Sequence, residues 1–87
     1  MSEDRATRLK RLRMRSIRRG IKEMDLILGH YSEGLEGLSA DELAGYELLL
    51  EENDHDLYAW VSGSAAPPPH LRALIAKISR ATADKST

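Results

Sequence analysis

The clearest helical signal in the chain is the stretch SADELAGYELLL at residues 39–50. It opens with a capping box, in which the Ser39 hydroxyl accepts a free backbone N–H and the Glu42 side chain reaches back to the Ser39 N–H. Apolar residues then recur at helical spacing, which predicts a buried face made of Leu43, Tyr46, Leu49 and Leu50. We expect this helix to end near Asn53.

The chain on both sides of this stretch shows the same three- and four-residue spacing of apolar side chains. It predicts helices at residues 4–18, 20–29 and 69–81, and a short helix capped by Asp54. The predicted buried side chains are Leu9, Leu12, Ser16, Met24, Ile27, Leu28, Tyr31, Leu57, Tyr58, Trp60, Val61, Leu71, Leu74, Ile75 and Ile78. Gly29, Gly34 and Gly37 indicate a loop, which Leu35 and Leu38 pin to the core. The proline-rich stretch at residues 62–69 predicts a stiff linker.

Strand-type alternation is absent, so the sequence predicts an all-α fold of four or five helices. We expect one domain over residues 1–87, with frayed ends near 1–4 and 82–87.

The composition excludes several classes of function. The absence of cysteine excludes a disulfide scaffold, a thiol nucleophile and an iron–sulfur site. No apolar run approaches the ~18–20 residues that span a bilayer, and no secretory signal is visible, so we expect a cytoplasmic protein without membrane insertion. The thin core of so small a domain argues against an enclosed active site, and we expect no enzyme activity. His30, His55 and His70 share no metal-ligand spacing, so no metal site is expected.

Charge is strongly segregated along the chain. Residues 1–22 hold nine basic and two acidic side chains, whereas residues 23–56 hold eleven acidic and no basic ones. Such segregation indicates either that oppositely charged helices pack together or that the surface orients a charged partner. The basic first helix could neutralise phosphates. Nucleic-acid binding is nevertheless the less favoured alternative, because no aromatic residue interleaves with these charges and the acidic remainder would repel a polyanion.

The segment RRGIKEMD, residues 18–25, allows two compatible interpretations. Glycine inside a helix costs about 1 kcal/mol relative to alanine, so Gly20 calls for a reason. It could form a corner between two helices, with Glu23 as a third-position cap. It could also form a docking site, in which the missing Cβ of Gly20 lets a partner's backbone approach between Arg19 and Glu23. In a continuous helix these two charged residues would form an exposed ion pair on one face.

Two motifs together form a family resemblance. Arg19-Gly20-x-x-Glu23-x-Asp25 is followed by Asp54-x-Asp56-Leu57-Tyr58-x-Trp60. Their order and spacing in a short helical chain resemble the succinate dehydrogenase flavinylation factor family, also called assembly factor 2, over residues 5–80. The chain departs from this pattern at residues 29–32, where many relatives carry Pro and Phe. The contribution of that loop to an interface stays open.

The resemblance implies a five-helix bundle that binds the flavoprotein subunit of succinate dehydrogenase, and in some bacteria the related fumarate reductase. It implies that the protein promotes covalent attachment of FAD to a histidine of that subunit. The implied partner-binding residues are Arg18, Arg19, Gly20, Lys22, Glu23 and Asp25. We expect Arg19 and Glu23 to contact polar groups near the partner's flavin site while Gly20 permits close approach.

FAD is too large for this core to enclose, so we expect no tightly bound cofactor and FAD handled on the partner protein. A monomer or a weak homodimer is expected. The remaining alternatives are a nucleic-acid-associated protein and an antitoxin-like interaction module.

Overall fold

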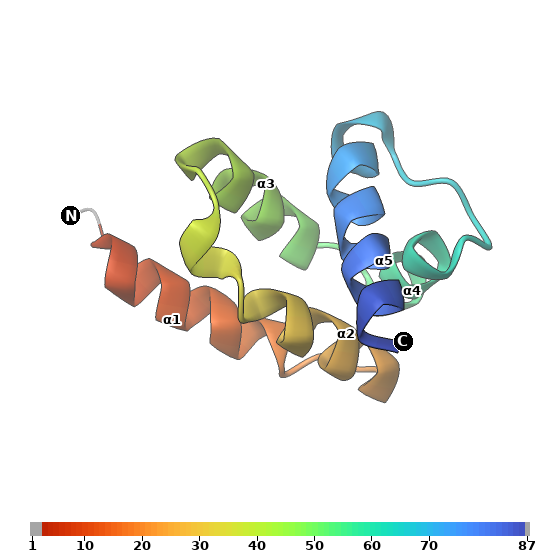
Figure 1. Cartoon of the computed structure of the whole chain (residues 1–87), viewed down its shortest axis with the longest axis horizontal. Helices are drawn as coiled ribbons and strands as arrows, with labels where there is room; N and C mark the ends of the chain where they lie inside the picture. The colour runs from red at the N-terminus through yellow and green to blue at the C-terminus, as the bar shows by residue number, and fades with distance from the viewer. Residues whose placement is uncertain (1–2, 87) are drawn as a thin grey trace.

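The computed structural model describes residues 3–86, and the side chains of residues 3–83, as helices joined by turns (Figure 1). In chain order the elements are α1 (Arg5–Ser16), α2 (Lys22–Ser32), the 3₁₀ turn η1 (Leu35–Gly37), α3 (Ala40–Leu50), α4 (Asp54–Ser62), the 3₁₀ turn η2 (Pro69–Leu71) and α5 (Arg72–Ser86). These described residues include no strand, and the all-α prediction is confirmed. Across them, none of the helices combines the length and apolar character that a bilayer span requires.

Helix α2 is the central element of the bundle. It contacts α1, α4 and α5, whereas α3 packs on α1. Figure 1 shows α1 and α2 running antiparallel along one edge of the molecule, with the turn between them at the end away from the N-terminus. That turn therefore forms an exposed corner of the fold, and it contains Gly20.

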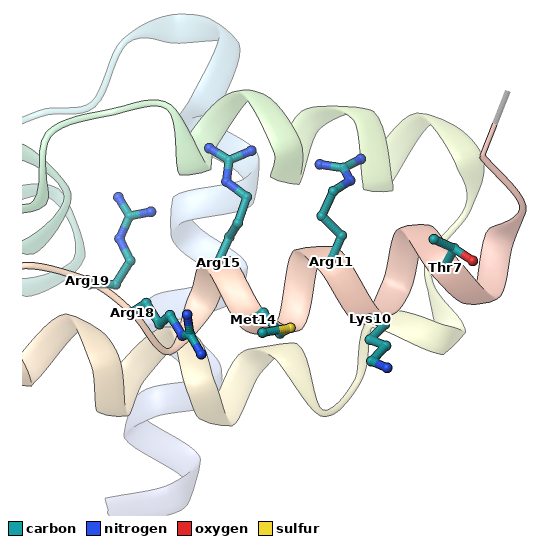
Figure 2. Close-up of a pocket in the computed structure, with 7 residues that line it drawn as sticks. All are labelled: Thr7, Lys10, Arg11, Met14, Arg15, Arg18 and Arg19. Atoms are coloured by element: carbon teal, nitrogen blue, oxygen red, sulfur yellow. The ribbon is translucent and has the colours of Figure 1, made fainter. Parts of the chain in front are cut away.

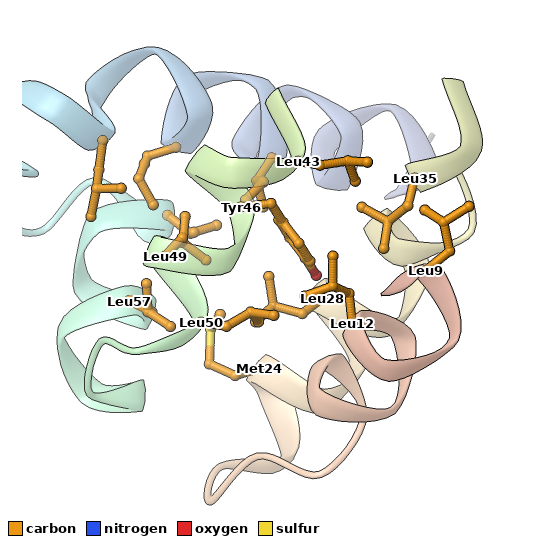
Figure 3. Close-up of a cluster of buried hydrophobic side chains, with 14 residues drawn as sticks. Leu9, Leu12, Met24, Leu28, Leu35, Leu43, Tyr46, Leu49, Leu50 and Leu57 are labelled. Carbon is orange, nitrogen blue, oxygen red and sulfur yellow. The ribbon is translucent and has the colours of Figure 1, made fainter. Parts of the chain in front are cut away.

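One hydrophobic core holds the helices together (Figure 3). Its buried members are Leu9, Leu12, Met24, Leu28, Leu35, Leu43, Tyr46, Leu49, Leu50, Leu57, Val61, Leu71, Ile75 and Ile78. The capping box at Ser39 and Glu42 forms as predicted, and the four residues of the predicted α3 face are all buried. The regular apolar spacing therefore identified most of the core.

A pair of hydroxyl groups lies inside this core and joins α1 to α3. Ser16 donates its hydroxyl hydrogen to the Leu12 carbonyl at 2.7 Å, so its oxygen accepts the Tyr46 hydroxyl at 2.5 Å. Burial raises the pKa of Tyr46 to about 12. This contact explains why a serine occupies a core position of α1.

The predicted end of the second helix at Gly29 is wrong, because α2 continues to Ser32. A Cβ at Gly29 would lie 3.1 Å from Cγ2 of Ile17. The glycine therefore serves the close crossing of α1 and α2 and does not end the helix. A local interpretation of glycine as a breaker could not anticipate this tertiary contact.

The predicted cap of the fourth helix is also wrong by one residue. Asn53 is the N-cap, and its side chain accepts the backbone N–H groups of His55 and Asp56. Asp54 is the first residue of α4, and its carboxylate points elsewhere, as described below. Helix α3 correspondingly ends at Leu50, before the predicted Asn53.

Tyr58 corrects the predicted core on α4. Leu57 and Val61 are buried and Trp60 packs half-buried against the core, but Tyr58 is 41% exposed. A short helix that lies on the surface buries only one face, and Tyr58 falls outside it.

Helix α5 continues to Ser86, past its predicted end near residue 81. Its predicted first turn is the separate 3₁₀ turn η2. The predicted fraying at residues 1–4 and 82–87 falls partly on residues 1, 2 and 87, which lie outside the described residues, and it stays a prediction.

Candidate functional site

The corner between α1 and α2 is held by two carboxylates that accept backbone N–H groups. The N–H of Arg19 donates to Oδ1 of Asp25 at 2.5 Å, from the first turn of α2. The N–H of Gly20 donates to Oδ2 of Asp54 at 2.5 Å, from the start of α4. The corner that was predicted between two helices at residues 18–25 is therefore confirmed, but its predicted cap by Glu23 is wrong. Both bonds involve an ionised acceptor and belong to the stronger class of hydrogen bonds.

The guanidinium of Arg19 points into the molecule. Its Nε lies 2.6 Å from Oδ1 of Asp54, and the two side chains are only 10% and 16% exposed. Its two terminal nitrogens donate to the carbonyls of Leu50 and Glu52, each at 3.0 Å. These carbonyls lie at the C-terminal end of α3, where helix carbonyls have no intrahelical partner and a cation is favoured. Arg19 therefore ties the corner to the α3–α4 connection.

This contact brings the two sequence motifs together. Arg19 and Gly20 of the first motif both bind the carboxylate of Asp54, the first residue of the second motif. The sequence placed Asp54 at a helix cap and gave no sign of its contact with Arg19. The only hint in the sequence is that one motif contains an arginine and the other an aspartate, which could form an ion pair.

The expected pair of Arg19 with Glu23 does not form. Arg19 lies before the first residue of α2, so the two side chains do not share a helix face. Glu23 does not cap the helix either, because no side-chain hydrogen bond caps the start of α2 at Ile21. The acidic residue that supports the corner is Asp25, which accepts the Arg19 N–H.

Gly20 makes a close internal contact. A Cβ at this position would lie 3.1 Å from Oδ2 of Asp54, closer than side-chain atoms ordinarily pack. The backbone approach that glycine permits is thus made by the chain's own carboxylate. Approach by a partner from the open side of Gly20 stays a prediction.

Three of the predicted partner-binding side chains lie on the outer surface of the corner. Arg18, Lys22 and Glu23 are exposed, and none forms an ion pair or side-chain hydrogen bond with a described residue. The apolar side chains of Ile17 and Leu26 are also exposed and were not predicted as surface residues. The corner therefore presents a mixed polar and apolar surface, with Arg19 and Asp25 supporting it from inside.

Most of the basic side chains of α1 are engaged by the chain's own acidic residues. Arg8 and Arg11 pair with Glu47 at 2.9 and 3.0 Å, and Arg11 also pairs with Glu3 at 2.8 Å. The other contacts are Arg13 with Glu36, Arg15 with Glu51, and Arg5 with the carbonyls of Glu36 and Leu38. Burial opposes ionisation of Glu47, but hydrogen bonds from Arg11 and Arg8 outweigh it, so the pKa of Glu47 lies below its usual value. The segregated charges thus largely neutralise one another between α1 and the acidic segment.

The described residues offer no group of three or more histidines or carboxylates arranged around a possible metal ion. Nδ1 of His30 lies 3.8 Å from the exposed carboxylate of Glu33, and no further described histidine or carboxylate joins these two to form a possible metal site.

Comparisons with known proteins give a consistent result. Residues 10–82 match the model of a family described as "Flavinator of succinate dehydrogenase". The chain is 41% identical over 61 residues to a mitochondrial succinate dehydrogenase assembly factor 2 of Meyerozyma guilliermondii, with 69% of this chain and 45% of that protein covered. A Penicillium rubens protein of the same name is 38% identical over 63 residues, covering 71% of this chain and 20% of that protein.

A bacterial relative has a more similar length. The FAD assembly factor SdhE of Legionella pneumophila strain Lens is 34% identical over 62 residues, covering 70% of this chain and 78% of that protein. The chain spans less than half of the two fungal relatives. No solved structure matches it significantly.

Proposed function

The chain belongs to the family of flavinators of succinate dehydrogenase, and from this membership we propose that it binds the flavoprotein subunit of succinate dehydrogenase and promotes covalent attachment of FAD to that subunit. The observation that carries this proposal is the family match over residues 10–82, which includes the corner and all of α2, α3 and α4. The bacterial relative named as an FAD assembly factor supports the same role.

The protein acts in this proposal as an assembly factor and not as an enzyme. The electrophile is the flavin and the nucleophile is a histidine of the flavoprotein, so no side chain of this chain needs to take part in bond formation. Binding that favours one arrangement of the flavoprotein's domains is sufficient, because a ligand shifts a conformational equilibrium by its difference in affinity for the two states. FAD stays on the client, and the helper binds no cofactor tightly.

The contact surface proposed here is the outer side of the corner, at Arg18, Gly20, Lys22 and Glu23. Arg19 and Asp25 belong to the same segment but act as positioning residues, because both are used in holding its backbone. This changes the role expected for Arg19, whose guanidinium donors already bind three internal acceptors. Fumarate reductase is proposed as a second client, and a cytoplasmic monomer as the working form.

The experiment that tests this function measures the covalent flavin on the client. The flavoprotein subunit is expressed with and without this protein, denatured, separated by electrophoresis and examined for flavin fluorescence. The fluorescence should rise when the wild-type chain is present. An equal signal in its absence would contradict the proposed function.

A substitution of Glu23 tests the proposed surface. Glu23→Ala should lower flavinylation while leaving the melting temperature almost unchanged, because the Glu23 side chain makes no ion pair or hydrogen bond with a described residue. Asp41→Ala is the matched control, since Asp41 is an exposed acidic residue at the same position of the first turn of α3. Flavinylation lowered equally by both variants would show that the corner is not the contact surface.

A further inference from the structure

Helix α1 carries two parallel rows of side chains along its length (Figure 2). Arg11 and Arg15, followed by Arg19 just past the helix, form an inner row that points toward α3. Lys10, Met14 and Arg18 form an outer row that points away from α3. Within α1 the paired members of each row, Lys10 with Met14 and Arg11 with Arg15, are four apart and so share a helix face. Arg18 and Arg19 lie just past the end of the helix.

The two rows differ in whether the chain itself engages them. Every arginine of the inner row has an acidic partner: Glu3 and Glu47 for Arg11, Glu51 for Arg15 and Asp54 for Arg19. In the outer row, neither Lys10 nor Arg18 forms an ion pair or side-chain hydrogen bond with a described residue. The internal neutralisation of α1 thus stops at the outer row and leaves it as unmatched positive surface.

An open hollow of about 490 Å³ lies over this part of α1. It is lined by both rows and by Thr7. Met14 stands at its centre between the two free cations and is 42% exposed. Lys10 lies on α1, and Arg18 lies two residues past its last residue, so the two cations stand on either side of Met14 (Figure 2). An exposed methionine between two cations offers an apolar contact site with a positive charge on either side.

We propose that the outer row of Lys10, Met14 and Arg18 docks an acidic segment of the flavoprotein client, in which two carboxylates flank an apolar side chain. The carboxylates pair with Lys10 and Arg18, and the apolar side chain packs on Met14, whose flexible thioether adapts to irregular partners. This inference rests on the proposed function and extends its contact surface, because the outer row leads from α1 to Arg18, which lies in the turn to α2. Arg18 belongs to both parts of the surface.

The chemistry of the surface favours an acidic protein over a nucleic acid. Of the five cations that line the hollow, Arg11, Arg15 and Arg19 are already paired with acidic residues of the chain, which leaves few charges to neutralise phosphates. No aromatic residue lies in the hollow to stack a base. The neighbouring hollow between α1 and α3 is lined by Arg8 together with Glu47 and Glu51, so its charges are mixed and do not extend the positive surface.

The test measures binding of the purified apo-flavoprotein subunit to the full chain at about 50 and about 300 mM salt, because exposed charge pairs weaken as screening increases. The double variant Lys10→Glu/Arg18→Glu should raise Kd at least about tenfold at low salt and reduce its salt dependence. Arg72→Glu/Arg80→Glu is the matched control, since both arginines are exposed on α5, form no ion pair with a described residue and undergo the same change of charge. The control should stay within about twofold of wild type.

A second pair of variants tests the proposed apolar contact at Met14. Met14→Ser should weaken binding of the client by about threefold or more, whereas Leu48→Ser, an exposed apolar residue of α3, should not. Equal melting temperatures are expected for both variants, because both side chains are largely outside the core. A Met14→Ser variant that binds like wild type would overturn the apolar part of the proposal.

The outcomes separate this inference from the proposed function. If the wild-type chain promotes flavinylation and both charge-reversed variants bind the client with the same Kd, the outer row is not a docking surface and the proposed function stands. If the wild-type chain neither binds the client nor raises its covalent flavin, both are wrong. A third outcome would assign the outer row to nucleic acid instead. The chain would then be retained on a DNA duplex in a salt-sensitive way, and Lys10→Glu/Arg18→Glu alone would abolish this retention while leaving client binding unchanged.

Discussion

At the scale of single residues, Asp54 is the side chain on which the candidate site depends. One carboxylate oxygen pairs with Arg19, and the other accepts the N–H of Gly20. Neither the guanidinium nor the carboxylate is well exposed to water, so loss of one leaves the other desolvated and without its opposite charge. Substitutions at Arg19, Gly20 or Asp54 therefore alter the shape of the corner before they alter any contact with a partner.

The first prediction concerns Asp54. Asp54→Asn removes the negative charge beside Arg19 while keeping the size of the side chain. It should lower the free energy of unfolding by about 2 kcal/mol, in the range of hydrogen bonds to charged groups. Urea unfolding followed by circular dichroism measures this loss.

Asp56→Asn is the matched control for Asp54→Asn. Asp56 is exposed, also lies in the first turn of α4, and its carboxylate forms no ion pair in the described part of the chain. It should change the unfolding free energy by no more than about 0.5 kcal/mol. Equal effects of the two variants would mean that the general preference for acidic residues near a helix start, and not the Arg19 contact, explains Asp54.

At the scale of elements, two glycines inside helices occupy different surroundings. Gly45 in α3 has no atom within 4 Å of the place where a Cβ would lie, whereas at Gly29 in α2 the Ile17 side chain lies 3.1 Å away. Gly45→Ala should therefore raise the free energy of unfolding by about 0.5–1 kcal/mol through helix propensity alone. Gly29→Ala should raise it less, because part of the gain is lost in displacing Ile17. Thermal unfolding of the two variants side by side measures the difference, and an equal gain would contradict the close crossing of α1 and α2.

The helices themselves could be predicted where local signals specify them. The capping box at Ser39 and the apolar spacing of α2, α3 and α5 depend on neighbours within one or two turns, so the sequence shows them directly. Predictions failed where residues far apart in the sequence meet. Gly29 lies inside α2 against Ile17, and Asp54 binds Arg19 and Gly20 while Asn53 caps α4. The segment at residues 18–25 forms the corner that the sequence allowed, but the inward direction of Arg19 could not be predicted for the same reason.

At the scale of the whole molecule, the segregated charges serve mainly to hold segments of the same chain together. The sequence left open whether the basic and acidic segments pack together or face a partner. The structure shows the first: Arg5, Arg8, Arg11, Arg13, Arg15 and Arg19 bind acidic side chains or carbonyls of the chain itself. Lys10, Arg18 and Lys22 are exposed and remain outside this network of the described residues.

This arrangement predicts that acid weakens the attachment of α1 through Glu47. The folded-state pKa of Glu47 lies below its usual value of 4.5 because the hydrogen bonds from Arg11 and Arg8 outweigh the opposing effect of burial. A carboxylate with a lowered folded-state pKa contributes stability that is fully present above its unfolded pKa and is lost as the pH falls through its folded pKa.

Glu47→Gln removes this contribution, about 1 kcal/mol for a partly exposed charge network. The difference in melting temperature between wild type and Glu47→Gln should therefore be largest at about pH 7 and shrink steadily toward about pH 3. Glu52→Gln, whose side chain forms no ion pair with a described residue, should follow the wild-type pH dependence throughout. A constant difference for Glu47→Gln across this range would mean that the residue acts by packing and that its charge does not hold α1 to α3.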